Sequence, residues 1–350
     1  MPDERTLSRL FEGALPFPET GRVFLVHPPD FLLRRASESL EPERLQVSER
    51  MLERVEAMAA RHSDCAIAHE SGPSPSAGDC LLLPVEKHRL RFQSELQRLS
   101  RAIGAEGRLL VYGSKKEGVL PAQELLEKQG RVEVLRHRGG ARILSFRPDP
   151  SRDWELPELP DRYHATARGH SLELAALPGV FSYNELDEAS ALLLEAADLR
   201  EGDRVLDLAC GNGVVGTFLA KEERAASVSF TDSDALALEA TRKTLALNNI
   251  DAPVLAADAG DRLPEKSFDL VLCNPPWHRD YSQDRAPGER VLAGAWRLLD
   301  SKGRLMLVGP GFHDPLPLLE DSFKNIRLVA ETPSHRVFSA RKRGRKRKSF

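Results

Sequence analysis

Three glycines and an asparagine stand together in residues 205–216, whose sequence is VLDLACGNGVVG. An apolar run leads into Gly211, Asn212 and Gly213, and an apolar helical pattern follows from Val214. Glycine tolerates a positive φ angle and lets a ligand approach the backbone closely. The pattern therefore predicts a ligand-binding loop between a strand and a helix.

A carboxylate beside this loop indicates which kind of ligand it binds. Gly211, Gly213 and Gly216 also match the GxGxxG pattern of dinucleotide-binding domains, which is weakly specific by itself. Asp207 stands four residues before the first glycine, where its charge would repel a pyrophosphate and attract a cation. S-adenosylmethionine carries an ammonium and a sulfonium group and no phosphate, so it is the cofactor we expect. NAD-dependent redox chemistry is the alternative, and it predicts saturable NADH binding.

Two further carboxylates close the next two predicted strands. Asp232 comes 25 residues after Asp207, a spacing at which a carboxylate accepts hydrogen bonds from ribose hydroxyls. Asp258 ends the run VLAAD and is expected to bind the adenine amino group; its alternative role is a helix N-cap. Residues on the same turns complete the predicted cofactor site, namely Ala209, Asn212, Ser233 and Ala259.

The tetrapeptide Asn274-Pro275-Pro276-Trp277 follows the apolar run FDLVLC. A conjugated amino group is a poor nucleophile, because its lone pair is delocalised. The Asn274 side-chain oxygen and the Pro275 carbonyl would each accept one N–H and aim the lone pair at a methyl carbon. Trp277 offers a face for stacking a planar substrate. We predict an N-methyltransferase site at Asn274, Pro275, Pro276 and Trp277, with Asn274 also contacting the cofactor; the alternative is a proline-rich turn with a buried tryptophan.

Short buried strands must position these residues. In the second half, apolar runs predict strands at residues 204–208, 227–231, 254–257, 268–273 and 304–308. Asp234 is predicted to cap a helix that starts at Ala235, and residues 326–340 to form a terminal hairpin. Strands that alternate with helices indicate an α/β fold with a parallel, doubly wound sheet.

The first half of the chain shows the same alternation, with strands predicted at residues 22–26, 80–83 and 108–112 and helices at 46–60 and 86–103. The segments DCLLLP and GRLLVYG parallel the later DLVLCNPP and GRLMLVG, which indicates a duplication or a chance likeness of α/β segments. The first copy lacks the glycine loop and the tetrapeptide, which favours a scaffold or RNA-binding role. Prolines in the intervening segment predict a linker, so the chain is divided into an N-terminal domain (1–150), a linker (151–165), a catalytic domain (166–340) and a flexible tail (341–350).

The composition excludes several classes of protein. A chain of 350 residues with 41% hydrophobic and 29% charged residues can form two packed cores, which argues against disorder. Its four cysteines form no CxxC pair, so neither a metal site nor a disulfide framework is expected. There is no apolar run long enough to span a bilayer, and the acidic start is unlike a signal peptide. We therefore expect a cytoplasmic protein without membrane contacts.

The net charge of −3 combines an acidic body with a basic end. Seven of the eight residues RKRGRKRK at positions 341–348 are basic, and without them the net charge is −10. Such a segment is expected to be flexible and to bind a polyanion without sequence preference. The predicted RNA-binding residues are Arg341, Lys342, Arg343, Arg345, Lys346, Arg347 and Lys348.

The combination of DLACGNG with NPPW resembles the class I S-adenosylmethionine-dependent N-methyltransferases. More narrowly, LPGVFSYNELDEASALLLEA and NPPWH are similar to ribosomal RNA guanine-N2 methyltransferases of the RsmC/RlmG type, and VYGSKKEGVLPAQELLEK to their N-terminal domain. The resemblance is strong over residues 177–340 and weak before residue 80. It implies a seven-stranded Rossmann-like catalytic domain after a smaller, degenerate domain of similar fold.

The same resemblance implies methylation of the N2 amino group of a guanine in ribosomal RNA, with the RNA or a ribosomal subunit as partner. It also implies that Asp207, Gly211, Gly213, Asp232 and Asp258 bind the cofactor and that residues 274–277 hold the base. In these enzymes the loop with Phe181 and Ser182 folds over the cofactor, so Phe181 joins the cofactor-binding set. The alternative for this loop is a hydrophobic staple before a helix at residues 185–197 that Asn184 caps.

This chain departs from that family at Trp277, where phenylalanine is commoner, and at Arg279-Asp280, where a glycine is usual. His278 is interpreted as a supporting or solvated side chain rather than a base. Methylation of a protein glutamine or of adenine in DNA stays open as an alternative, as does a non-catalytic RNA-binding or ribosome assembly role. The nucleotide, the ribosomal subunit and the oligomeric state are not specified by the sequence.

Overall fold

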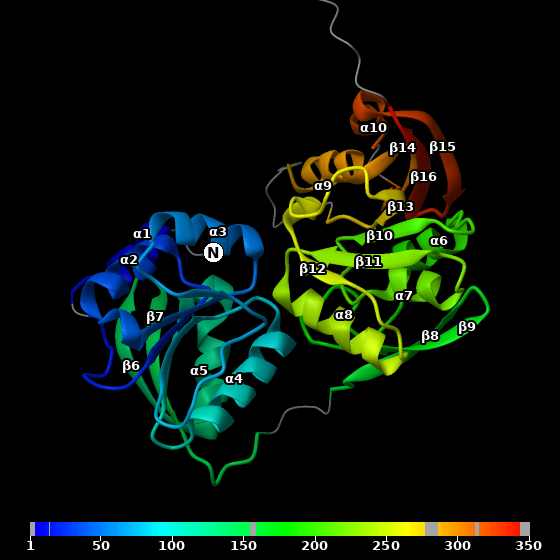
Figure 1. Ribbon diagram of the computed structural model, residues 1–350. Coiled ribbons are helices and arrows are strands. Elements are labelled where there is room, and N and C mark those ends of the chain that lie inside the picture. The colour runs from blue at the N-terminus through cyan, green and yellow to red at the C-terminus, as the bar shows by residue number, and fades with distance from the viewer. Residues whose placement is uncertain (1–3, 14, 155–158, 277–285, 312–314, 344–350) are drawn as a thin grey trace, which may run out of the picture. The chain divides into compact units, whose positions relative to one another are not determined.

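The computed structural model describes residues 4–13, 15–154, 159–276, 286–311 and 315–343 (Figure 1). Contacts within the chain divide it into two units, Met1–Leu159 and Pro160–Phe350. Each unit is built on one seven-stranded sheet with helices packed against it. The α/β fold with two domains of similar type is therefore confirmed.

The sheet of the second unit has the strand order β12-β11-β10-β13-β14-β16-β15. Pairing is parallel from β12 through β14, and the last two strands are antiparallel. The strands are β10 (Arg204–Leu208), β11 (Ser227–Asp232), β12 (Val254–Ala256), β13 (Phe268–Cys273), β14 (Leu299–Pro310), β15 (Phe323–Glu331) and β16 (His335–Lys342). All five strands predicted for this half are confirmed, as is the terminal hairpin.

Helices cover both faces of this sheet because its strands are apolar on both sides. Along β13, Leu270 and Leu272 belong to one buried cluster and Val271 and Cys273 to the other. The first cluster lies under α6 (Glu188–Ala196), α7 (Val214–Lys221) and α8 (Ala235–Leu247), and the second under α9 (Ala286–Leu298) and α10 (Leu316–Ser322). This two-sided burial is typical of a doubly wound parallel sheet.

A hairpin that the sequence analysis missed opens the second unit. Strands β8 (Arg162–Ala167) and β9 (His170–Ala175) form a separate two-stranded sheet, with Arg168 and Gly169 in the turn at positive φ. Tyr163, Ala165, Leu172 and Leu174 point into the core under α7 and α8. Because β8 starts at Arg162, the last four residues of the predicted linker (151–165) and the predicted domain start at residue 166 fall inside this hairpin.

The first unit repeats the topology of the second. Its sheet has the order β3-β2-β1-β4-β5-β7-β6, which matches the other sheet strand for strand. The strands are β1 (Val23–Val26), β2 (Leu45–Glu49), β3 (Ile67–His69), β4 (Cys80–Pro84), β5 (Arg108–Ser114), β6 (Gly130–Arg138) and β7 (Ala141–Pro148). Identical order in two seven-stranded sheets favours the duplication over a chance likeness.

The helices of the first unit are α1 (Glu4–Leu10), α2 (Asp30–Ser39), α3 (Leu52–Arg61), α4 (Arg89–Ile103) and α5 (Val119–Gln129), with short 3-10 turns at Pro42–Arg44 and Lys115–Glu117. The helix predicted at residues 46–60 is partly wrong. Residues Leu45–Glu49 form the buried strand β2, and the helix begins only at Leu52.

The predicted flexible tail starts too early. Arg341 and Lys342 belong to β16, and the Arg343 backbone N–H donates to the Ser322 carbonyl. The Lys342 side chain is buried, donates to the Leu299 carbonyl at 2.6 Å, and lies 4.7 Å from the centre of the Trp296 ring. The burial of Lys342 argues against its predicted role as an RNA contact, whereas Arg345, Lys346, Arg347 and Lys348 lie outside the described residues.

The four cysteines form no disulfide. Within the described ranges, no group of three or more metal-ligating side chains is found. No helix in the same part of the chain is both long enough and apolar enough to span a membrane.

Candidate active site

The glycine loop lies at the carboxyl end of β10, where the strand order of the sheet reverses between β10 and β13. Ligands of open α/β sheets bind at this point. Ala209, Gly211 and Gly213 have φ angles of +60°, +59° and +77°, so the loop turns sharply before α7 begins at Val214. A Cβ atom on Gly211 would meet nothing within 4 Å, whereas one on Gly213 would lie 2.8 Å from Thr241 Cγ2. Gly211 therefore faces open space, and Gly213 allows α7 to pack against α8.

Asp207 is the next-to-last residue of β10 and is buried, with 4% of its surface exposed. Its Oδ2 accepts a hydrogen bond from the Gly216 N–H at 2.8 Å, which ties the strand to the first turn of α7. Burial raises the pKa of Asp207 to about 7, and the nearby charge of Asp232 adds to this effect.

Asp232 ends β11 and reaches the glycine loop. Its Oδ2 accepts from the Gly211 N–H at 3.0 Å, and its Oδ1 accepts from the Asp234 N–H at 2.9 Å. Burial raises the pKa of Asp232 to about 6, with a further contribution from the charge of Asp234. Asp234 itself caps α8 by accepting from the Leu236 N–H, so this prediction is confirmed.

Asn212 is held from outside the loop by the hairpin that the sequence analysis missed. The side-chain amide of Asn212 is buried and donates to the Tyr163 hydroxyl of β8 at 2.9 Å, while its oxygen accepts from the Val214 N–H. The Thr241 hydroxyl of α8 donates to the Gly211 carbonyl at 2.9 Å. The available signal for Tyr163 was the alternation of polar and less polar residues in RYHATA, which is typical of a strand, directly before a turn that contains glycine.

Asp258 follows β12 and begins a short 3-10 turn, Asp258–Gly260, whose N-cap is Ala257. Its carboxylate forms an ion pair with Arg290 of α9 at 3.1 Å. Ala259 has a φ of +47°, and a Cβ on Gly294 would lie 2.0 Å from the Ala259 carbonyl oxygen. Gly294 thus lets α9 pack directly on the turn that carries Asp258 and Ala259.

Asn274 follows the last residue of β13, at the same edge of the sheet as the glycine loop. Its Nδ2 lies 3.3 Å from Ser190 Oγ and 3.5 Å from Asp187 Oδ1, both at the start of α6. Because the two oxygens accept from the amide nitrogen, the Asn274 Oδ1 atom is left to accept from a substrate. Pro275 is buried and Pro276 is exposed.

Asp187 and Ser190 contact Asn274, a role that the sequence did not assign to either residue. Asn184 was predicted to cap a helix at residues 185–197, but α6 spans Glu188–Ala196 and its N-cap is Asp187, which accepts from the Ser190 N–H. The signal was an aspartate directly before an apolar helical run. Asp187 thus serves the helix and the Asn274 amide together.

The remaining predicted residues differ in their surroundings. Phe181 lies on an exposed turn with 66% of its surface accessible, and Ser182 beside it has a φ of +56°. Ser233 lies between β11 and the Asp234 cap. Trp277 and His278 lie outside the described residues.

The geometry fits a cofactor that brings positive charge and a ribose. Among the described residues, neither Asp207 nor Asp232 forms an ion pair with a cationic side chain, and burial opposes the charge of each. A cation at this edge would relieve that cost. The open space at Gly211 leaves the backbone accessible to such a ligand.

Comparisons with known proteins agree with this geometry. The family described as Methyltransferase small domain matches residues 171–339. Ribosomal RNA small subunit methyltransferase C of Aeromonas hydrophila is 34% identical over 274 residues, which cover 77% of this chain and 79% of that protein. The protein of the same name from Pseudomonas aeruginosa (strain UCBPP-PA14) is 34% identical over 237 residues, 67% of this chain and 71% of that protein.

A solved structure is similar over nearly the whole chain. The Thermus thermophilus 16S rRNA N2 G1207 methyltransferase (RsmC), in complex with AdoMet and guanosine, matches with a TM-score of 0.81 and 25% identity, covering 97% of this chain and 92% of that chain. The chain belongs to the ribosomal RNA small subunit methyltransferase C family of S-adenosylmethionine-dependent methyltransferases.

Proposed function

We propose that this protein methylates the exocyclic N2 amino group of a guanine in small-subunit ribosomal RNA. The observation that carries the proposal is the Asn274 side chain, whose amide nitrogen is held by Ser190 and Asp187 at the sheet edge that carries Asp207 and Asp232. The names of the relatives and the guanosine in the Thermus thermophilus structure support ribosomal RNA and guanine as substrate.

The cofactor-binding role is proposed for the buried acids and the loop between them. When bound, S-adenosylmethionine supplies an electrophilic methyl group on a positively charged sulfur. Asp207 contributes negative charge beneath the loop. Each carboxylate oxygen of Asp232 accepts one backbone N–H and can accept a second hydrogen bond, from a ribose hydroxyl. Asp258 and Ala259 line the adenine side of the edge, and the exposed Phe181 ring covers the ligand.

The residues after β13 orient the base. Asn274 Oδ1 and the Pro275 carbonyl accept the two N–H bonds of the amino group, which localises the nitrogen lone pair and directs it away from the ring. The guanine nitrogen would become cationic as its bond to the methyl carbon forms and the methyl–sulfur bond breaks, its electron pair remaining on the sulfur; the nitrogen would then lose a proton to solvent. A general base is therefore not required before the transfer.

The test uses methyl-labelled S-adenosylmethionine with small ribosomal subunits assembled from unmodified RNA. We expect label in the ribosomal RNA, recovered as N2-methylguanosine after digestion and mass analysis. Label in protein alone, in adenine, or in no acceptor would contradict the proposal.

A matched variant separates chemistry from cofactor binding. Asn274→Ala is assayed at saturating cofactor, because Asn274 is also predicted to contact the cofactor. Its transfer rate should fall by about 100-fold, since a preorganised hydrogen-bond acceptor at the reacting group is removed. Asn274 follows β13 at the edge of the sheet, and the substitution removes only its side-chain contacts with Ser190 and Asp187. An unchanged transfer rate would therefore exclude Asn274 from the reaction.

A further inference from the structure

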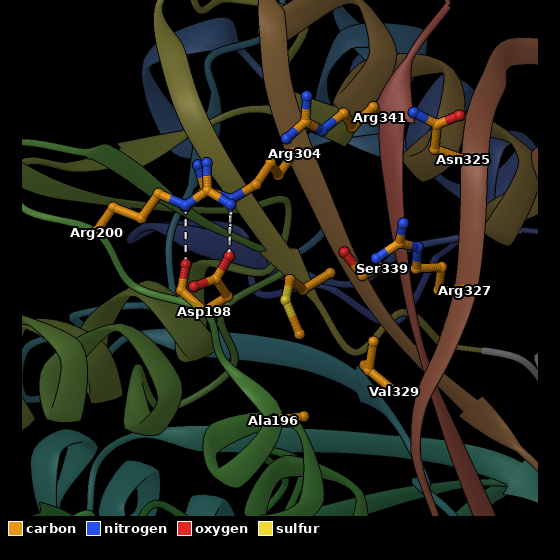
Figure 2. A pocket seen from close by; sticks show the side chains of 10 residues that line it. Ala196, Asp198, Arg200, Arg304, Asn325, Arg327, Val329, Ser339 and Arg341 are labelled. Atoms are coloured by element: carbon orange, nitrogen blue, oxygen red, sulfur yellow. Dashed lines mark hydrogen bonds and ion pairs between the residues drawn. The ribbon is translucent and has the colours of Figure 1, made fainter.

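A cavity of about 420 Å³ lies over β14, β15 and β16, on the face of the second sheet that α6 covers (Figure 2). Arg304 pairs with Leu270 near the start of β13, whereas Asn274 follows the end of that strand. The cavity therefore lies toward the opposite end of the strands from the cofactor loop. Its charged and polar lining residues, which we call the arginine pocket, are Asp198, Arg200, Arg304, Asn325, Arg327, Ser339 and Arg341.

Strand register brings these side chains together. Arg304 of β14 stands directly opposite Arg341 of β16, and Ser339 stands opposite Arg327 of β15. Opposite residues of antiparallel strands share a face, so Arg304 and Arg341 are neighbours on the pocket side. Like charges in this position repel each other. The sheet thus concentrates positive charge at one place on its surface.

Only part of this charge is neutralised by the protein. Arg304 is buried and forms an ion pair with Asp203 at 2.5 Å, and Arg200 forms one with Asp198 at 2.8 Å. Figure 2 shows Asp198 joined to Arg200 and Arg304 by dashed lines, with none reaching Arg327 or Arg341. In the described portion of the chain, neither Arg327 nor Arg341 has a carboxylate or other acceptor.

A second observation comes from Arg304. Arg304 lines the pocket although its side chain is 92% buried, and its Nε atom has no hydrogen-bond partner, the Asp198 carboxylate being 3.7 Å away. An N–H group without an acceptor in a buried position is costly. An anion between Arg304, Arg327 and Arg341 would add negative charge beside this incompletely bonded guanidinium and would relieve the repulsion between the three arginines.

We propose that the arginine pocket binds a phosphate group of the ribosomal RNA backbone, an inference that rests on the proposed function. Guanidinium groups form paired hydrogen bonds with phosphate oxygens, and Ser339 and Asn325 add neutral donors. The body of the protein carries a net charge of −10 outside its basic end, so a polyanion needs a local cationic site to dock. Arg341 contacts RNA from this pocket and not from a flexible tail.

The experiment compares Arg327→Gln, Arg341→Gln and the double variant with Lys324→Gln. Lys324 pairs with Arg341 across the hairpin but does not line the pocket, so this control removes one charge from the same surface. Each protein is titrated with unmodified small-subunit ribosomal RNA at several KCl concentrations. Cofactor binding is measured by calorimetry, and thermal unfolding confirms that each variant folds.

We expect the double variant to bind RNA about tenfold more weakly, as loss of a charged hydrogen bond implies. Its salt slope should fall by about 0.7–0.9, the value for one lost phosphate contact. Lys324→Gln should stay within about twofold of the wild type, and cofactor affinity should be unchanged in all variants.

Two outcomes would overturn the proposal. Equal losses in Lys324→Gln and in the pocket variants would show diffuse attraction without a site. A second outcome is that inorganic phosphate binds the wild type but not the double variant, while both proteins bind RNA with equal affinity. The pocket would then be a site for free phosphate alone. Absence of methyl transfer to RNA by the wild type would instead refute the proposed function, so the two failures are separate.

Discussion

Replacing Asp207 by Asn tests whether this buried carboxylate carries an unrelieved charge in the protein without cofactor. Burial raises the pKa of Asp207 from 3.8 to about 7. Between about pH 4 and pH 7 the folded protein therefore keeps a proton on this carboxyl group that the unfolded chain has already released. Stability must then fall as pH rises from about 4 to about 7 and stay level above that. The change amounts to about 4 kcal/mol in total, at about 1.4 kcal/mol per pH unit.

Asn has nearly the shape of Asp and can still accept from the Gly216 N–H, but it does not titrate. The stability difference between Asp207→Asn and the wild type should therefore rise in favour of the variant between pH 5 and pH 7. Affinity for S-adenosylmethionine at pH 7.5 should fall, because the carboxylate that balances the cation is gone. We expect a loss of about tenfold or more, as for removal of a charged interaction.

The assay is urea unfolding of the full chain without cofactor at pH 5, 6, 7 and 8. The transition of the second unit is the one that moves to higher urea when cofactor is added. Asp269→Asn is the matched control, since Arg204 lies 2.8 Å from Asp269 and lowers its pKa. That change should remove less than about 1 kcal/mol, equally at all four pH values.

Parallel stability curves for Asp207→Asn and the wild type would refute the reasoning. They would show that the carboxyl does not change its protonation between pH 5 and pH 7. Unchanged cofactor affinity would separately remove Asp207 from the binding site.

Three further changes have expected outcomes. Gly213→Ala should lower the melting temperature more than Gly211→Ala. Both changes place a side chain at positive φ, at a cost of about 1 kcal/mol, but only the Cβ at position 213 would collide with Thr241. Asp187→Ser keeps a helix cap but is too short to hold the Asn274 amide, so kcat should fall about tenfold with stability and cofactor affinity nearly unchanged; an equal loss of stability would indicate a structural role only. Lys342→Met should cost about 1–3 kcal/mol in urea unfolding, because a buried carbonyl loses its donor, and should leave RNA affinity as it is.

The strand ends that carry the site could be predicted because they follow buried apolar runs. Asp207, Asp232 and Asn274 each stand at or just after the end of such a run, and parallel strands place their carboxyl ends at one edge. Both the sheet and the approximate place of the site follow from local pattern and from the general topology of α/β folds.

The contacts that orient the site could not be predicted in the same way. Asp187 and Tyr163 reach Asn274 and Asn212 across 87 and 49 residues of chain. No local pattern encodes such pairs, because they depend on how α6 and the β8–β9 hairpin pack on the sheet. The hairpin was missed because the prolines before it suggested a linker, and the start of α6 was misplaced because Asn184 was taken as its cap.

The basic end shows how tertiary structure can overcome composition. Lys342 is buried although lysine is usually exposed. The carbonyl of Leu299, just beyond the last residue of α9, accepts from its ammonium group, and the Trp296 ring lies beneath it. Helix C-terminal ends attract cations, so a residue of a charged run becomes part of the core at that position.

The two units share a topology but differ in whether a cationic side chain pairs with the acidic residue at the end of β2 or of its counterpart β11. Glu49 ends β2 as Asp232 ends β11. In the first unit, Arg54 Nε lies 3.0 Å from Glu49 Oε2 and His27 Nδ1 lies 3.3 Å from Oε1. Although burial acts to raise it, these partners hold the pKa of Glu49 below its ordinary value.

Asp232 has no such cation among the described residues, and its pKa is raised to about 6. The first unit therefore satisfies its acid internally and offers no net negative charge to a cationic ligand, while the second unit holds two acids that a cation would stabilise. Calorimetric titration of the full chain with S-adenosylmethionine should accordingly saturate at one equivalent, and Asp207→Asn should weaken that single event. A second equivalent that survives in Asp207→Asn would show that the first unit has kept a ligand site despite its ion pair.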